Sequence, residues 1–134
     1  MKEKRVKCRI HIVILGSLML LASLYPLGYG QDSSKDSGLT GKITTSDPRF
    51  GNLITDISSA QFSDLGYRVG DQVHLTIAGK PYELPFVHAY NDVPQGKPLL
   101  IISATSNLAI AVNHGNAQTL FGVTPPSPIT IRKK

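Results

Sequence analysis

The sequence predicts an all-β fold, a small antiparallel β-barrel or sandwich of about seven short strands with two short helical turns. From residue 40 onward, short runs of β-forming residues recur at close spacing, and glycine, proline, asparagine and aspartate stand between them. This pattern is typical of small antiparallel domains. No strand-like run alternates with a long helical one, which excludes a doubly wound nucleotide-binding sheet.

The expected strands are short and closely spaced. The clearest is 73–77, where apolar and polar residues alternate, so that one face should be buried and the other solvated. The following residues 78–81 should turn this strand back on itself as a hairpin. All the ranges predicted as strands are 41–45, 53–57, 72–77, 82–87, 99–103, 108–112 and 129–132.

Two helical turns are expected between the strands, at 59–65 and at 115–120. Gly66 follows the first and Gly122 the second. Glycine at these positions provides the left-handed residue that ends many helices. Neither helix is long enough to organise the fold.

Length, composition and charge fit one modest globular domain. The chain has 134 residues, of which 41% are apolar and 17% charged. Its formal charge of +5 is concentrated at the two ends, whereas six basic and eight acidic residues between positions 31 and 131 give a net charge of −2. A nucleic-acid partner is therefore not expected, since it requires a basic surface on the folded domain.

The first 30 residues have the order of a secretory signal peptide: a basic stretch, an apolar run at 10–24, and small residues before Gln31. We expect an exported protein, periplasmic or secreted. The alternative is an uncleaved anchor that holds the chain in the membrane through residues 10–27. The single cysteine, Cys8, would be lost on cleavage. Residues 31–39 are polar and predict a flexible linker, with the domain at 40–134.

Two polar clusters could carry function. Asp47, Phe50 and Asn52 surround a turn between two strands, although an aspartate there can also simply cap its own turn. The run 113–116 follows an apolar strand, and there an asparagine, Asn113 or Asn116, can equally cap the next helix. The histidines of the domain are too scattered in sequence for a metal site, so no metal is predicted.

Four segments carry a family resemblance. They read DPRFGNLITDI at 47–57, LGYRVGDQVHLTIAG at 65–79, AYNDVPQGKPL at 89–99 and NLAIAVNHGNAQTLFG at 107–122. In this order they resemble the carboxy-terminal domain of the S-adenosylmethionine hydroxide adenosyltransferases, relatives of the fluorinating and chlorinating enzymes. The resemblance spans essentially all of 40–134.

The resemblance implies a homotrimer in which an amino-terminal α/β domain of one subunit meets the barrel of its neighbour. The implied reaction is attack of water or hydroxide on the 5′ carbon of S-adenosylmethionine, which gives adenosine and methionine. S-adenosylmethionine or adenosine is the expected ligand, and no cofactor is expected. Because the water-activating carboxylate belongs to the amino-terminal domain, we expect this chain to need a separate α/β partner and to be inactive alone.

The resemblance also assigns roles to individual residues. Asp47 would meet the amino group of the methionine part, Asn52 would hydrogen-bond the adenine, and Tyr90 would pack on the nucleoside. The backbone of the stretch from Val112 to His114 would contact the adenine edge. The complete set of expected ligand-binding residues is Asp47, Phe50, Asn52, Tyr90, Val112, Asn113 and His114.

One position departs from the family pattern. Ala104 stands where the family has a serine whose hydroxyl lies near the methionine carboxylate. Three hypotheses therefore stay open: a ligand-binding half-site, a non-catalytic exported barrel used for assembly or surface interaction, and a truncated gene product with no role of its own. Function depends on the site rather than on the fold, so the fold does not separate them.

Overall fold

The computed structural model describes residues 38–134. The predicted signal peptide or anchor at 1–30, including Cys8 and the apolar run, lies outside these residues, as does most of the predicted linker. The predicted domain at 40–134 is described in full.

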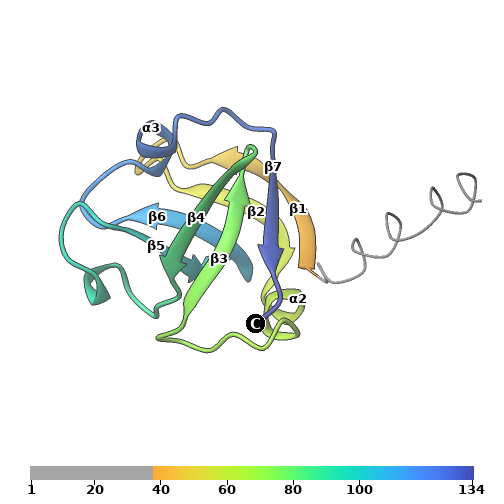
Figure 1. The fold of residues 1–134 in the computed structure, drawn as a ribbon. Coiled ribbons are helices and arrows are strands. Elements are labelled where there is room, and N and C mark those ends of the chain that lie inside the picture. The colour runs from red at the N-terminus through yellow and green to blue at the C-terminus, as the bar shows by residue number, and fades with distance from the viewer. Residues whose placement is uncertain (1–37) are drawn as a thin grey trace, which may run out of the picture. The chain divides into compact units, whose positions relative to one another are not determined.

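Seven strands form one antiparallel sheet (Figure 1). In sheet order, the strands are β4-β3-β7-β1-β2-β6-β5, so that the last strand of the chain lies between the first and the third. Their bounds are β1 Gly38–Ser46, β2 Leu53–Ser58, β3 Gln72–Ile77, β4 Lys80–Pro85, β5 Pro98–Ile102, β6 Asn107–Val112 and β7 Ser127–Arg132.

The two edge strands of this sheet approach each other and nearly close it into a barrel. Phe86, directly after β4, forms a parallel bridge with Leu100 of β5. The backbone N–H of Val87 also donates to the carbonyl of Leu100 at 3.0 Å. Closure covers backbone groups that an open sheet would expose. The predicted fold class, a small all-β barrel with about seven strands and two short helices, is confirmed.

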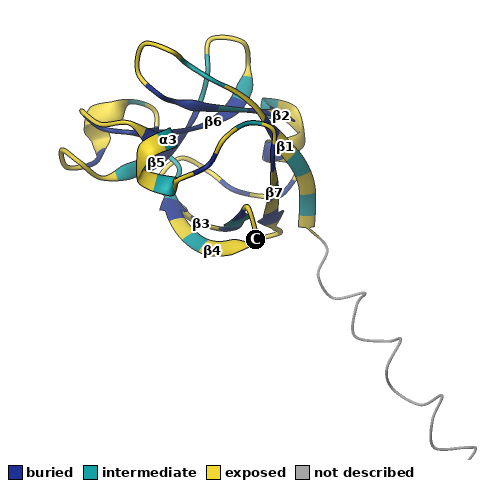
Figure 2. Ribbon diagram, turned by 90° about the horizontal axis from the view of Figure 1, so that it is seen from above, coloured by how far each residue is buried: buried dark blue, intermediate teal, exposed yellow. Residues whose placement is uncertain are grey.

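The core is formed by the alternate residues of the strands that point inward. In β3, Val73, Leu75 and Ile77 are buried while the residues between them are more exposed, as the sequence pattern predicts. β7 repeats the same alternation. Figure 2 shows buried residues on the strands and exposed ones mainly in the loops. The most deeply buried large side chains include Ile43, Leu53, Phe62, Leu108, Ile110, Ile129 and Ile131.

A smaller second core lies on the other face of β5 and β6. There Leu99 and Ala111 pack against Val87 and Val93, which belong to the connection between β4 and β5. This connection contains the short 3-10 helix η3, Tyr90–Asp92. Because β6 is buried on both faces, it holds this connection in place beside its own carboxyl end.

Both predicted helices are present, and each is shorter than expected. Helix α2, Ser59–Ser63, begins with a capping box between Ser58 and Gln61. Helix α3, Ala117–Phe121, is capped by Asn116 and ends at Gly122, whose φ of 64° is left-handed as predicted.

Most strand boundaries differ from prediction by one to three residues, and the starts of β1 and β4 show why. β1 begins at Gly38, three residues early, because Gly38 to Ile43 pair continuously with β7 at the far end of the chain. Gly38 and Leu39, which were assigned to the linker, are thus part of a strand. The β3–β4 hairpin turns on only Ala78 and Gly79, both with positive φ, which suits a tight hairpin turn. β4 therefore starts at Lys80 rather than at residue 82.

Candidate functional site

A cavity of about 490 Å³ lies where β1 and β6 end and β2 begins. Its volume falls in the range of small-molecule sites, roughly 300–1,000 Å³. Three segments distant in sequence form it: the β1–β2 loop, helix η3 and the turn after β6. The lining residues are Arg49, Phe50, Asn52, Tyr90, Val112, Asn113, His114, Gly115 and Asn116.

The structure brings six of the seven predicted ligand residues to this cavity. The exception is Asp47, which does not line it. Its Oδ1 instead accepts hydrogen bonds from the backbone N–H groups of Arg49 at 2.7 Å and Phe50 at 3.3 Å. Asp47 thus closes the turn that the sequence offered as the simpler explanation, and its contact with a ligand stays a prediction.

Gly51 allows helix α3 to pack directly on the β1–β2 loop. Its φ is 70°, and a Cβ atom at this position would come within 2.2 Å of the Asn116 side chain. The carbonyl of Gly51 accepts a hydrogen bond from the backbone N–H of Gln118 at 3.0 Å. The β1–β2 loop, which carries Asn52, and the first turn of α3 are therefore held together.

Asn52 is the polar side chain of this loop that points into the protein. It is only 7% exposed, and its Nδ2 donates a hydrogen bond of 3.1 Å to the hydroxyl of Tyr90. Tyr90 itself is 46% exposed and Phe50 is 57% exposed. A buried amide and two exposed aromatic rings in the lining of one cavity provide hydrogen-bonding capacity and stacking surfaces together.

Asn113 is a second buried amide, 6% exposed, and it holds the segment that follows η3. Its Nδ2 donates to the carbonyl of Val93 at 2.8 Å. Its backbone N–H donates to Lys97, and its carbonyl accepts from Gly96, at 3.0 and 2.7 Å. Asn113 is therefore held both by its backbone and by its side chain, and its side-chain amide keeps an oxygen and a second N–H beyond the bond to Val93.

His114 supplies the remaining backbone groups on this side of the cavity. Its φ of 52° is left-handed, and its N–H and C=O make no hydrogen bond within residues 38–134. In the stretch 112–114, whose backbone contact with the adenine stays a prediction, the Val112 carbonyl by contrast already accepts one bond from Gly115.

The lining contains no carboxylate. Arg49 places its guanidinium carbon 5.8 Å from the ring centre of Phe50, so the rim carries a cation beside an aromatic surface. Amides, aromatic rings and one cation suit the recognition of a planar polar ligand. The lining offers no acid–base pair of the kind that would activate a water molecule.

The described part of the chain offers no cluster of three or more potential metal ligands. His74 lies on β3 with its Nδ1 3.9 Å from Glu83, far along the sequence from His88 and His114. In the same residues, 38–134, no helix has the length and apolar character needed to cross a membrane.

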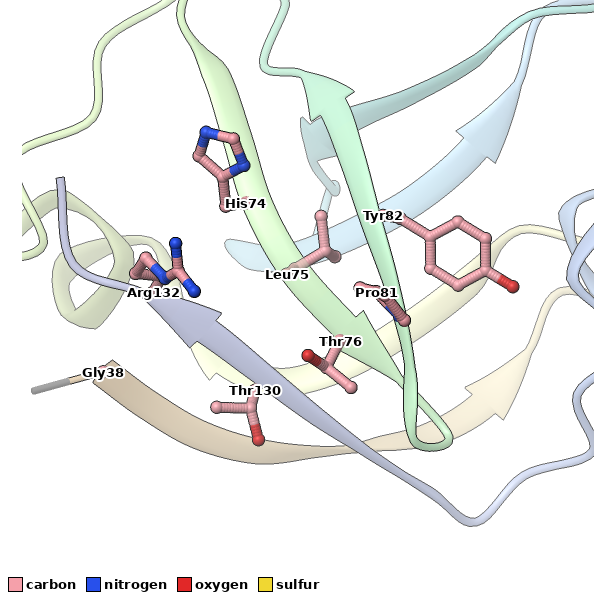
Figure 3. A pocket seen from close by; sticks show the side chains of 8 residues that line it. All are labelled: Gly38, His74, Leu75, Thr76, Pro81, Tyr82, Thr130 and Arg132. Atoms are coloured by element: carbon pink, nitrogen blue, oxygen red, sulfur yellow. The ribbon is translucent and has the colours of Figure 1, made fainter. Parts of the chain in front are cut away.

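A second, smaller cleft of about 190 Å³ lies over β3, β4 and β7 (Figure 3). His74 and Thr76 lie on β3, and Thr130 and Arg132 lie on β7, with His74 and Arg132 toward the same end of the cleft. These side chains are exposed or half-buried. Sequence reasoning assigned this cleft no function.

Sequence reasoning missed three residues of the cavity: Arg49, Gly115 and Asn116. Asn116 was expected only as a helix cap, and its Oδ1 does accept from the backbone N–H of Thr119 at 2.9 Å. Their positions in the sequence were the available signal, since Arg49 and Gly115 directly adjoin the predicted residues Phe50 and His114, and Asn116 lies two residues after His114.

Fold and cavity together define a small antiparallel barrel with a site built from its loops. The family model described as the SAM hydroxide adenosyltransferase C-terminal domain matches residues 41–130. The chain belongs to this family.

Individual proteins are also similar to this chain. The chain is 32% identical over 80 residues to a protein named fluorinase from Nocardia brasiliensis, covering 58% of this chain and 27% of that protein. Among crystal structures, an uncharacterized conserved protein from Thermotoga maritima matches with 29% identity and a TM-score of 0.66, over 69% of this chain and 35% of that one.

A conserved hypothetical protein from Thermus thermophilus matches with 28% identity and a TM-score of 0.54, over 72% of this chain and 36% of that one. The chain thus matches only about a quarter to a third of the length of these relatives.

Proposed function

We propose that the cavity binds adenosine, free or as part of S-adenosylmethionine, and forms one half of a SAM hydroxide adenosyltransferase-like site. The observation that carries this proposal is the buried amide of Asn52, bonded to Tyr90, in a cavity that the exposed rings of Phe50 and Tyr90 also line. An amide both donates and accepts hydrogen bonds, which matches a purine edge. The two rings provide surfaces on which a base can stack.

Burial of these polar groups supports ligand binding over a purely structural role. Burying an amide is unfavourable unless hydrogen bonds compensate. Asn52 has one such bond and Asn113 has one from its side chain, so each amide keeps unused capacity beside a cavity. A ligand would satisfy that capacity.

For catalysis we propose a second domain, whether in a longer polypeptide or a separate one. No carboxylate lines the cavity, and the family reaction needs an activated water molecule. The relatives are three to four times as long as the part this chain matches. An α/β domain, in a trimer as the family resemblance implies, would cover the exposed Phe50 and Tyr90 and complete the site.

A non-catalytic barrel that serves assembly is the second candidate, and one observation favours it. Asp47, which would meet the methionine amino group, turns its Oδ1 onto its own loop. In addition, Ala104 replaces the family's serine. On this view the exposed rings bind a partner protein and no nucleoside.

The decisive experiment is a calorimetric titration of the full chain with adenosine, alone and with a separately expressed amino-terminal domain from a relative. We expect Asn52→Ala to weaken binding about tenfold or more, since a purine edge loses its partner. The fold should survive, because backbone hydrogen bonds between Asp47 and Asn52 hold the turn. Thr76→Ala, on the outer cleft, is the matched control. Absence of binding in both formats would reject the half-site in favour of the assembly role.

Export is a separate proposal, which rests on the basic, apolar and small-residue order of residues 1–30. Mass spectrometry of the protein from an exported fraction should show a chain that begins near Gln31. Recovery of the full-length chain in the membrane fraction would support the anchor instead.

A further inference from the structure

Basic residues are concentrated at one end of the barrel, where β7 finishes. Residues 38–134 contain eight lysines and arginines and six aspartates and glutamates. Four of the basic residues lie at this end, and of the acidic ones only Asp64 and Asp71 do. Elsewhere in these residues the two signs balance, so the net positive charge belongs to this end. We call the surface the basic end, and its cations are Arg68, Arg132, Lys133 and Lys134.

Hydrogen bonds fasten the residues at the end of β7 to the loop between α2 and β3. The backbone N–H of Lys134 donates to the carbonyl of Leu65 at 3.2 Å. The hydroxyl of Tyr67 donates to the carbonyl of Arg132 at 2.8 Å. Arg68 directly follows Tyr67 in this loop. Cations from two distant parts of the chain are thus held on one surface.

Three of the four cations are free to attract an anionic partner. Nζ of Lys134 lies 2.6 Å from the carboxylate of Asp71, which offsets its charge. The other three are exposed and form no ion pair with another group of residues 38–134. Val69, which directly follows Arg68, is an apolar side chain that is 45% exposed. Cations beside an exposed apolar group suit the headgroup region of an anionic bilayer.

The chain enters the domain at this same end. Gly38, the first residue of β1, pairs with Arg132 at the end of β7. Figure 1 shows the C-terminus beside α2, with α3 at the opposite end of the barrel. Ten residues, 28–37, separate Gly38 from the predicted anchor at 10–27, and they span at most roughly 35 Å. An anchored chain would keep the basic end near the bilayer, where a short tether makes weak attraction sufficient.

We propose that the basic end, together with Val69, docks on an anionic lipid membrane. β1 runs from this end to Ser46, and the larger cavity lies beyond that residue. Docking would therefore leave the cavity open to solvent or to a partner domain. This inference goes beyond the proposed function and does not depend on nucleoside binding. The alternative occupant of the basic end is an acidic protein.

The test places a fluorescent probe at either end of the barrel in the full chain. Val69→Cys labels the basic end. Leu120→Cys, at an apolar residue of α3 that is 54% exposed, labels the opposite end. Both variants carry Cys8→Ser, which removes the single native cysteine. The chain is added to vesicles of phosphatidylcholine, either alone or with an equal part of phosphatidylglycerol. The predicted anchor would insert into both, so a difference between them reports the effect of lipid charge.

We expect the emission of labelled Val69→Cys to shift to shorter wavelength on the anionic vesicles and not on the neutral ones. Labelled Leu120→Cys should emit alike on both. Salt at about 1 M should reverse the shift, because the screening length then falls to roughly 3 Å. Absence of a shift at Val69→Cys would overturn the proposal and favour the acidic protein. An equal shift at Leu120→Cys would also overturn it, since the domain would then have no preferred face.

Charge variants of labelled Val69→Cys then assign the docking to the basic end. Replacing Arg68, Arg132 and Lys133 together by glutamine should lower the ratio of docked to undocked domain about a hundredfold, at roughly fivefold for each cation. All three side chains are exposed, so the fold should persist, which circular dichroism checks.

The matched control removes three exposed cations elsewhere, by Lys42→Gln, Lys80→Gln and Lys97→Gln. This change should leave the ratio of docked to undocked domain unaltered. An equal loss of docking in the control would mean that overall charge and not the basic end is responsible, which would overturn the proposal.

Discussion

The two clefts of the barrel differ in where their polar groups lie. The larger cavity is lined by Asn52 and Asn113, both almost fully buried, and by the exposed aromatic rings of Phe50 and Tyr90. The smaller cleft over β3 and β7 presents Thr76, Thr130 and other groups that already reach solvent (Figure 3). Burial of a polar group carries a free-energy cost, whereas an exposed threonine on a sheet face does not. Polar burial is therefore the reason we propose the larger cavity, and not the outer cleft, as the ligand site.

The largest destabilisation should come from Gly51→Ala beside the larger cavity, for which Gly79→Ala beside the outer cleft is the control. Gly51→Ala places a side chain at a φ of 70° and against Asn116, which must then move and give up its cap on α3. Gly79→Ala, in the β3–β4 hairpin, meets nothing within 4 Å at a φ of 84°.

Both substitutions strain the backbone by about 1–2 kcal/mol, and Gly51→Ala should lose about 1 kcal/mol more with the cap. Denaturant unfolding of the two variants measures this difference in the free energy of unfolding. Equal destabilisation would mean that the packing of α3 on the β1–β2 loop contributes nothing.

Asn113→Ala should come next in size. It removes the donor to the buried Val93 carbonyl and so should lower the free energy of unfolding by about 1–3 kcal/mol. For a domain of this size the midpoint of thermal unfolding should fall by several degrees. Thr76→Ala in the outer cleft should stay within about 0.5 kcal/mol of the wild type. If Thr76→Ala were the more damaging, the ranking of the two clefts by polar burial would be wrong.

The smallest effect concerns an exposed ion pair beside the outer cleft. Asp71 precedes β3, and its Oδ2 lies 2.6 Å from Nζ of Lys134, beyond β7. The hydrogen bond from Lys134, helped by one from the Arg68 backbone, lowers the pKa of Asp71 below its usual value. A lowered pKa stabilises the fold above the unfolded-state value of about 4, and this contribution is lost as the pH falls through the folded value.

Asp71→Asn should therefore lose a small amount of stability at neutral pH and lose less than the wild type on acidification below about pH 4. Asp64→Asn is the matched control, since the Asp64 carboxylate makes no ion pair or hydrogen bond in the described residues. Thermal unfolding at a series of pH values measures both variants. Identical pH profiles for wild type and Asp71→Asn would show that this exposed pair has no influence.

Local patterns predicted much of the fold. The alternation at 73–77 correctly indicated β3 and its buried face, and Gly122 correctly marked the end of α3. The early start of β1 was missed because its pairing with β7 lies some ninety residues away in sequence and leaves no local signal. Helix η3 was missed because a 3-10 helix of three residues is too short to show a period.

The residues that line the cavity could largely be predicted, but the hydrogen bonds that they make within the protein could not. The family resemblance indicated six cavity residues, and turn chemistry explained how Asp47 is used. The bond between Asn52 and Tyr90 joins positions 38 residues apart, and the bond from Asn113 ends on a backbone carbonyl. Neither residue spacing nor composition specifies such contacts, because they depend on how the η3 connection packs against β6.

The central claim, that the larger cavity and not the outer cleft receives the ligand, is tested most directly by NMR. The backbone amide signals of the ¹⁵N-labelled full chain would be followed during titration with adenosine. We expect shifts at Asn52, Tyr90 and His114, which line the cavity, and no shift at Thr76 or Thr130 in the outer cleft. Shifts confined to Thr76 and Thr130, or no shift anywhere at saturating adenosine, would contradict the account.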